Sequence, residues 1–219
     1  MKLKLLLLFI LAIFTLQARA QTGFPFDNEV RHFKKQDSLN APKPGGILFI
    51  GSSSIKLWDD LEKRFAGKPI IKRGLGGSQL CGWVNYYLPY VVFPYKPKKI
   101  FFYAGENDIA AGRKAEDVLA DFKKLHTMLR DSLPKAKIYY MAIKPSNARK
   151  NNLNEFVRAN DLVKAYIRNQ PKTKYVDVST VILSKETMLP DGSLFKPDQL
   201  HLNSKGYDRW EAVLKKYVN

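Results

Sequence analysis

Short apolar runs alternate with segments of helical periodicity along most of this 219-residue chain. The runs lie at 47–50, 70–71, 100–104, 138–143 and 175–178, and the helical periodicities at 55–65, 78–92, 115–132, 150–169 and 204–217. Strands that alternate with helices pair in parallel, and continuous apolar strands are typical of a sheet covered on both faces. The sequence therefore predicts an α/β fold, a three-layer α/β/α sandwich around a mainly parallel five-stranded sheet.

The first twenty residues, MKLKLLLLFILAIFTLQARA, combine lysines, an apolar run and a final small-residue pattern, Ala-Arg-Ala. This combination predicts a secretory signal peptide over 1–20, because the apolar run is shorter than the roughly 20 residues of a membrane-spanning helix. An uncleaved anchor is the alternative interpretation. We therefore expect an exported protein, periplasmic or extracellular, without a stable membrane anchor, with an N-terminal leader over 21–44 and one domain over 45–219.

The chain is strongly basic, with a formal net charge of +17 that falls to +14 without residues 1–20, which carry Lys2, Lys4 and Arg19 and no acid. Its cations are scattered, and no nucleic-acid-binding motif accompanies them, so we expect no nucleic-acid partner. An anionic envelope surface is a candidate partner, and a merely solvated basic exterior is the alternative. The single cysteine, Cys81, excludes an internal disulfide and any multi-cysteine metal site, and we interpret it as a small buried apolar residue.

Polar residues and glycines follow the first three apolar runs and precede the last helical segment. The four stretches are Gly51-Ser52-Ser53-Ser54, Arg73-Gly74-Leu75-Gly76-Gly77-Ser78, Gly105-Glu106-Asn107-Asp108 and Asp198-Gln199-Leu200-His201. In open parallel sheets, ligands gather outside the carboxyl ends of the strands. We therefore expect these stretches to converge on one edge of the sheet.

A serine hydrolase needs a hydroxyl, a base, a carboxylate that orients the base, and donors for an oxyanion. The candidates here are Ser53, His201, Asp198 three residues before it, and the Gly77 N–H with the Asn107 amide as donors. Simpler interpretations exist, since serine and asparagine often form caps and turns and a lone histidine is usually structural. The convergence of all five types favours the catalytic interpretation.

Other motifs fail at single positions. The nucleophile elbow G-x-S-x-G would need glycine at Ile55, a Walker loop lacks its second glycine, and a dinucleotide fingerprint fails at Gln79. The remaining histidines, His32 and His126, form no metal-ligand spacing with His201, and we interpret both as structural. We therefore expect neither a metal nor a cofactor.

In this order, the blocks FIGSSSI, RGLGGS, GEND and DQLH resemble the SGNH hydrolases, also called the GDSL esterase/lipase family. The resemblance implies a flavodoxin-like sheet and ester hydrolysis without a cofactor. It further implies that Ser53 is the nucleophile and that His201, oriented by Asp198, is the base. The implied oxyanion hole consists of the Ser53 and Gly77 N–H groups and the Asn107 side chain. The family's usual G-D-S has become Gly51-Ser52-Ser53, so the choice among the three serines rests on register, and Gly76 competes with Gly77.

These observations predict an exported serine esterase that hydrolyses short-chain esters, with acetyl groups on carbohydrates as the first candidates. The chain has no long insertion that could form a lid, which favours a short acyl group over a long one. The expected partner is a small-molecule or polysaccharide ester. The alternatives are an acyl hydrolase of the lysophospholipase or thioesterase type, and a catalytically silent carbohydrate- or envelope-binding domain.

Overall fold

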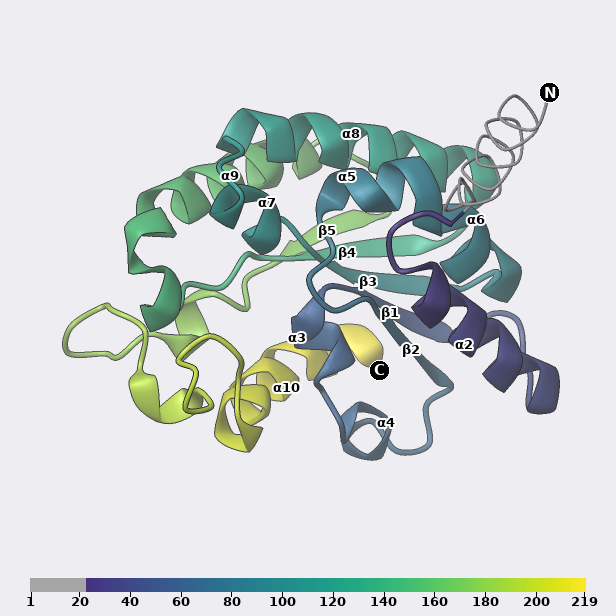
Figure 1. Ribbon diagram of the computed structural model, residues 1–219, viewed down its shortest axis with the longest axis horizontal. Coiled ribbons are helices and arrows are strands. Elements are labelled where there is room, and N and C mark those ends of the chain that lie inside the picture. Colours follow the sequence, from purple (N-terminus) through teal and green to yellow (C-terminus); the bar gives the residue numbers. More distant parts are fainter. Residues whose placement is uncertain (1–22) are drawn as a thin grey trace, which may run out of the picture.

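A five-stranded parallel sheet forms the centre of the protein, which a computed structural model describes over residues 23–219. The strand order is β2-β1-β3-β4-β5, and all four strand pairs are parallel. The strands are β1 (Ile47–Gly51), β2 (Ile70–Gly74), β3 (Lys99–Tyr103), β4 (Lys137–Met141) and β5 (Thr173–Val176). Helices cover both faces of the sheet, which confirms the predicted three-layer α/β/α fold (Figure 1).

The two faces of the sheet carry separate apolar cores, because successive side chains of a strand point to opposite faces. In β1, Leu48 and Ile50 belong to one core, while Ile47 and Phe49 belong to the other. All four are buried. This double burial explains why the strands occur in the sequence as continuous apolar runs.

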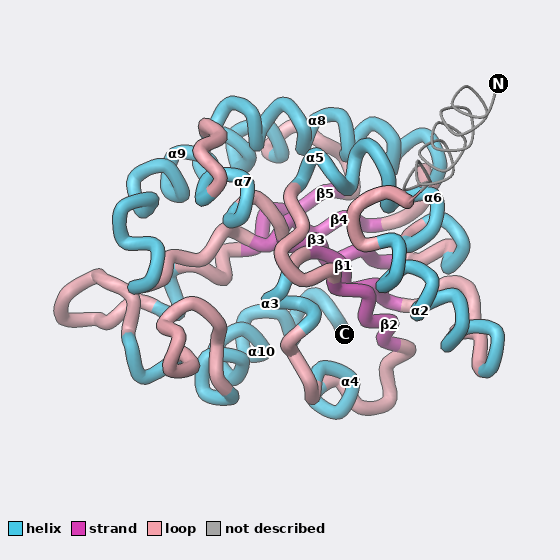
Figure 2. Tube along the Cα trace, viewed as in Figure 1, coloured by secondary structure: helices cyan, strands magenta, loops and turns pink. Residues whose placement is uncertain are grey.

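Each face has its own set of helices, and Figure 2 shows the two helical layers with the strands between them. The first layer contains α2 (Asp27–Leu39), α5 (Leu80–Gly82), α6 (Leu88–Val91), α7 (Glu106–Ala110), α8 (Ala115–Ser132) and α9 (Leu153–Ile167). A π-helical turn, Trp83–Tyr87, joins α5 to α6, so the periodicity at 78–92 is not one regular helix. The second layer contains α3 (Ser53–Lys56), α4 (Leu61–Arg64) and α10 (Ser204–Val218).

The predicted leader, 21–44, contains a helix that its polar sequence concealed. Helix α2 buries Val30 in the first core, and Phe24, Phe26 and Phe33 pack against the same core. The described part of the leader therefore packs against the domain. The predicted signal peptide lies outside the described residues, and within residues 23–219 no helix is both long enough and apolar enough to span a membrane.

The periodicity at 55–65 predicted one helix, and this prediction was wrong, because the segment forms two short helices, α3 and α4. The carbonyl of Trp58 accepts hydrogen bonds from Lys72 Nζ (3.0 Å) and from the Leu61 N–H (3.3 Å) instead of continuing an α-helical ladder. Ile55, Trp58 and Leu61 are nevertheless all fully buried. Their three-residue spacing reflects burial on one side and not a continuous helix.

Candidate active site

Backbone hydrogen bonds join the segments that follow β1, β2 and β3 at one edge of the sheet. The N–H of Leu75 donates to the carbonyl of Gly51 (2.8 Å), and the N–H of Ser52 donates to the carbonyl of Tyr103 (3.0 Å). The parallel register places Gly51 opposite both Gly74 and Tyr103. The predicted convergence of the serine, glycine and asparagine blocks therefore follows directly from strand pairing.

Two glycines let α3 approach the sheet closely. Gly51 has a φ of +140°, and a Cβ atom there would lie 1.9 Å from the carbonyl oxygen of Tyr103. A Cβ atom on Gly74 would lie 2.2 Å from the backbone nitrogen of Lys56, in α3. Both contacts are possible only for glycine. They fix α3, and with it Ser53 at its first position, against the ends of β1 and β2.

Ser53, His201 and Asp198 form a continuous chain of hydrogen bonds. Ser53 Oγ lies 3.0 Å from His201 Nε2, and His201 Nδ1 lies 2.7 Å from Asp198 Oδ2. An ionised carboxylate only accepts, so the Nδ1–H of the neutral imidazole donates to Asp198 and Nε2 is left to accept the serine proton. This is the arrangement in which an imidazole can remove the proton of a serine hydroxyl.

The second oxygen of Asp198 holds the loop that carries His201. Asp198 Oδ1 accepts hydrogen bonds from the backbone N–H groups of Leu200 and His201, both at 2.9 Å. Burial raises the pKa of Asp198, but the hydrogen bonds from the His201 ring and from these two N–H groups outweigh it and lower that pKa to about 2. Asp198 is therefore an anion at every pH at which an imidazole can act as a base.

The structure distinguishes the three consecutive serines by exposure. Ser52 and Ser54 are buried, at 2% and 1% exposure, whereas Ser53 is partly exposed. Ser54 Oγ has no hydrogen-bond partner among the described residues, and Tyr207 Oη donates to the Ser54 carbonyl (2.9 Å). Only Ser53 combines access from solvent with a histidine partner, and the register predicted for the nucleophile is the one that the geometry favours.

The two predicted oxyanion donors lie next to each other: Gly77 in the turn between β2 and α5, and Asn107 in the first turn of α7. Asn107 Nδ2 donates to the carbonyl of Ser78 (3.1 Å), next to Gly77. Gly77 is exposed and has a φ of +85°, in the left-handed region that favours glycine. A Cβ atom on the competing residue, Gly76, would instead press against Lys56 Cδ at 3.0 Å. The Asn107 amide and the exposed turn at Gly77 can thus face the same ligand.

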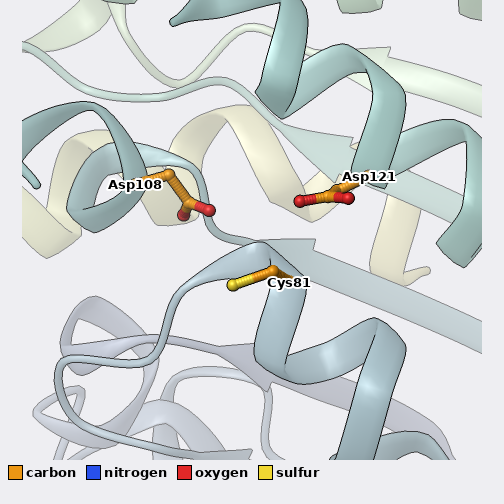
Figure 3. A group of neighbouring side chains, drawn as sticks. All are labelled: Cys81, Asp108 and Asp121. Atoms are coloured by element: carbon orange, nitrogen blue, oxygen red, sulfur yellow. The ribbon is translucent and has the colours of Figure 1, made fainter. Parts of the chain in front are cut away.

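Cys81, Asp108 and Asp121 form a second group of potential ligands (Figure 3). Their ligand atoms lie within 4.8 Å of one another. Arg113 Nη1 lies 3.1 Å from Asp108 Oδ1 and 2.7 Å from Asp121 Oδ2, and already supplies a positive charge. Asp108 also accepts the Leu80 N–H with both oxygens at 3.0 Å. The group is therefore a structural clamp on the start of α5, and Cys81 is only half-buried, not buried as predicted.

Sequence analysis missed two cations next to the site, Lys144 and Arg149. Lys144 follows β4 at the same edge of the sheet and is fully buried against Glu106. Arg149 Nη2 donates to Asn107 Oδ1 (2.8 Å). The signal was present, because Lys144 directly follows the apolar run 138–143, where a fourth strand end reaches the same edge.

Comparison with known proteins places these residues inside one region that matches a family model. The model of the GDSL-like lipase/acylhydrolase family matches residues 51–209. The human platelet-activating factor acetylhydrolase IB subunit alpha1 is 25% identical over 169 residues, which cover 74% of this chain and 70% of that protein. The matched region begins at the glycine before the candidate nucleophile and ends after the candidate base.

Solved structures show the same architecture. A GDSL-like lipase from Bacteroides thetaiotaomicron matches with a TM-score of 0.72 and 17% identity, over 86% of this chain and 96% of that one. A catalytic mutant of an acetylxylan esterase from Geobacillus stearothermophilus matches with a TM-score of 0.64 and 12% identity, over 81% and 95% respectively. At these identities the likeness shows a shared three-layer fold.

Proposed function

The chain belongs to the GDSL-like lipase/acylhydrolase family and is a serine ester hydrolase, and from that premise we propose that it removes short acyl groups, acetyl above all, from carbohydrate or other small esters. The observation that carries the proposal is the unbroken hydrogen-bonded chain from Asp198 through His201 to Ser53. A binding domain without activity has no need for a serine held against an oriented imidazole.

In the proposed reaction, Ser53 Oγ attacks the ester carbonyl while His201 Nε2 takes the serine proton. Asp198 keeps the imidazole in the required tautomer and stabilises the imidazolium that forms. His201 then protonates the leaving alcohol, and an acyl group remains on Ser53. Water attacks this acyl-enzyme with His201 again as base, which releases the acid and restores the serine.

The negative charge on the carbonyl oxygen needs donors that are already in place. We assign this role to the N–H groups of Ser53 and Gly77 and to the Asn107 amide. One Asn107 N–H is bonded to the Ser78 carbonyl, which leaves the second free for an oxyanion. Ser53 begins α3, and the N–H groups in a first helical turn have no partner within their helix.

The preference for acetyl rests on two supports. The relatives include an acetylhydrolase and an acetylxylan esterase, whose names specify acetyl esters. The elements beside Ser53 are also joined by short segments: α3 follows β1 with only Ser52 between them, and α7 begins three residues after β3 ends. Such short connections leave little chain beside Ser53 for a lid over a long acyl group.

Export and attraction to an anionic envelope surface are the further parts of the proposal. The predicted signal peptide and the charge of +14 without residues 1–20 support them. Electrostatic attraction is screened over a Debye length of about 8 Å at physiological ionic strength. Release of acetate from an acidic acetylated polysaccharide should therefore slow as salt is added, while hydrolysis of a neutral soluble acetate ester should not. If added salt changed both rates equally, the positive charge would have no role in substrate capture.

The deciding experiment is a series of p-nitrophenyl esters from acetate to palmitate. We expect a burst of p-nitrophenol as Ser53 is acylated, and kcat/KM that falls as the acyl chain lengthens. A screen of acetylated glycans then identifies the alcohol part. Faster hydrolysis of long chains would point to lysophospholipids, faster hydrolysis of thioesters would point to a thioesterase, and no hydrolysis at all would point to a silent binding domain.

A further inference from the structure

A lysine that the reaction does not use is completely buried beneath the site. Lys144 Nζ lies 3.0 Å and 3.1 Å from the two oxygens of Glu106, and it donates to the carbonyl of Leu200 at 2.8 Å. Lysine is almost never fully buried unless it is paired. Burial lowers the pKa of Lys144, and the adjacent carboxylate of Glu106 opposes that effect.

The Leu200 carbonyl belongs to the peptide that directly precedes His201. The N–H of Leu200 donates to Asp198 Oδ1. We call residues 198–201 the base loop. Lys144 therefore binds a carbonyl of the base loop, while Asp198 binds two of its N–H groups. Lys144 lies just after β4, so this bond anchors the base loop to the rigid edge of the sheet.

The same carboxylate also contacts the oxyanion side of the site. Arg149 Nη1 lies 3.5 Å from Glu106 Oε1, and Arg149 Nη2 donates to Asn107 Oδ1 at 2.8 Å. A guanidinium has only donors, so it must meet the oxygen of the amide. This bond turns the Asn107 NH₂ group toward Ser78 and the oxyanion position. A cationic donor on Oδ1 also polarises the amide and strengthens its N–H groups as donors.

Glu106 stands between the two cations and is itself only 4% exposed. Its third contact comes from Tyr103 Oη, which donates to Oε2 at 2.5 Å. Burial beside Glu106 raises the pKa of Tyr103, so this phenol stays protonated and keeps donating. The carboxylate therefore accepts hydrogen bonds from Tyr103 in β3 and from Lys144 just after β4, and forms an ion pair with Arg149.

We propose that Glu106, Lys144 and Arg149 form a positioning network that links the oxyanion amide of Asn107 to the base loop of His201. The inference rests on the proposed triad and adds three residues that never touch the reacting atoms. Lys144 fixes the position of the His201 imidazole through the Leu200 carbonyl. Arg149 fixes the orientation of the Asn107 amide, and Glu106 keeps both cations in place. A buried ion pair is a weak source of stability compared with well-packed apolar residues, so its presence here fits a role in positioning.

The test compares Lys144→Met and Arg149→Met with Lys99→Met. Like Lys144, Lys99 donates through Nζ to backbone oxygens, those of Tyr217, Val218 and Asn219, but it begins β3 at the opposite edge of the sheet. The same substitution there removes an equivalent lysine without touching the site. For each variant, kcat, KM and the pH dependence of kcat/KM are measured with p-nitrophenyl acetate.

We expect Lys144→Met to lower kcat/KM about 100-fold, because a displacement of about 1 Å in a reacting group has that effect. The midpoint of its pH profile should rise, since a nearby positive charge that disfavours the imidazolium is gone. Arg149→Met should lower kcat at least tenfold with KM and the pH midpoint unchanged, and Arg149→Lys should recover part of the loss. Lys99→Met should stay within about twofold of the wild type.

If Lys144→Met does not fold, the double variant Glu106→Gln/Lys144→Met removes both charges of the pair. It should lower kcat/KM by a similar factor, while its pH midpoint should stay close to that of the wild type, because the lost positive and negative charges have opposite effects on the imidazolium. The inference is refuted if Lys144→Met and Arg149→Met behave like Lys99→Met, or if Arg149→Met changes only KM. Ser53→Ala separates the two levels. If Ser53→Ala is inactive, wild-type-like behaviour of Lys144→Met and Arg149→Met refutes the positioning network alone. If Ser53→Ala is active, the proposed triad is refuted, and the network is refuted with it.

Discussion

Ser53, Gly77 and Asn107 each follow a buried strand within a few residues, whereas Asp198 and His201 lie in a segment between a 3-10 turn, Gly192–Leu194, and α10. The first side of the site is fixed by backbone bonds between strand ends, such as Ser52 N–H to the Tyr103 carbonyl. The second side is held by backbone bonds within its own segment, such as Lys196 N–H to the His201 carbonyl (2.7 Å), together with side chains, some of which reach it from elsewhere.

Several side chains contribute to holding this segment. Asn203 Nδ2 donates to the carbonyls of Ser193 and Phe195, Asn147 Nδ2 donates to Gln199 Oε1, and Lys144 Nζ donates to the carbonyl of Leu200. A strand end is placed by its sheet, but this loop is placed by a set of particular residues. The nucleophile side should therefore tolerate substitutions around it better than the base side.

The largest expected effect is on the nucleophile side. Ser53→Ala should lower kcat by about 10⁴-fold or more, because the covalent step is lost. The fold should remain, since only one oxygen atom is removed and Ser53 is partly exposed. Ser52→Ala and Ser54→Ala are the matched controls and should keep measurable activity. Phosphonate labelling followed by peptide mapping should find the label on Ser53; a label on either neighbour would contradict the register.

The next effect breaks the base side. Asp198→Asn should lower kcat by about 10⁴-fold, because an amide no longer selects the tautomer that leaves His201 Nε2 free to accept. Asp191→Asn, at the residue just before the Gly192–Leu194 turn, is the matched control. Asp191 accepts only from Ser193, so its substitution should leave kcat within about twofold.

The pH profile sharpens the same comparison. The pKa of Asp198 is lowered to about 2, so this carboxylate does not titrate in the range in which an imidazole does. In the wild type, kcat/KM should therefore rise with pH in a single step between roughly pH 5 and 8. A profile that is flat across this range would argue against a histidine base.

A smaller effect is expected for the oxyanion donor. Asn107→Ala should lower kcat by about 10²–10³-fold and change KM little, because the amide meets negative charge only in the transition state. Steady-state kinetics on p-nitrophenyl acetate measures both constants. A change confined to KM would make Asn107 a substrate-binding residue.

The smallest effect concerns stability and separates it from catalysis. Burial and the nearby Arg130 lower the pKa of His126, which contacts Tyr166 Oη and Thr173 Oγ1. His126 therefore binds a proton more readily in the unfolded chain than in the folded protein. The free energy of unfolding falls as the pH drops below about 6.5. For one group the slope cannot exceed about 1.4 kcal/mol per pH unit.

Denaturant unfolding at several pH values measures this slope, and His126→Gln should flatten it without moving the pH profile of kcat/KM. If His126→Gln moved the kinetic midpoint instead, the acid loss of activity would come from unfolding and not from His201.

The contrast between the two sides also explains what could be predicted from the sequence. The five strands, and Ser53, Gly77 and Asn107 near their ends, follow from apolar runs and parallel pairing. The grouping of Asp198 and His201 with Ser53 came from the chemistry that a serine hydrolase needs and from the family resemblance, since no local pattern places a loop that lies 148 residues away from its partner. Side chains that act at a distance, such as Lys144, leave only a weak trace in the sequence.

The helices were predicted less well than the strands, for a related reason. The three-residue spacing of Ile55, Trp58 and Leu61 reports burial on one side, and the break between α3 and α4 depends on Lys72, which reaches the Trp58 carbonyl from β2. Helix α2 was missed because it buries only Val30 fully. Contacts between elements, and not local sequence, decide both cases.

The order of the site residues along the chain has a consequence for biosynthesis. The nucleophile and both oxyanion donors are made first, and Asp198 and His201 come only with the last segment, just before α10. A growing chain thus carries a serine hydroxyl that no base can activate. If Ser53 and His201 act as proposed, we expect no hydrolysis of the producing cell's esters until the C-terminal segment has been synthesised and has docked.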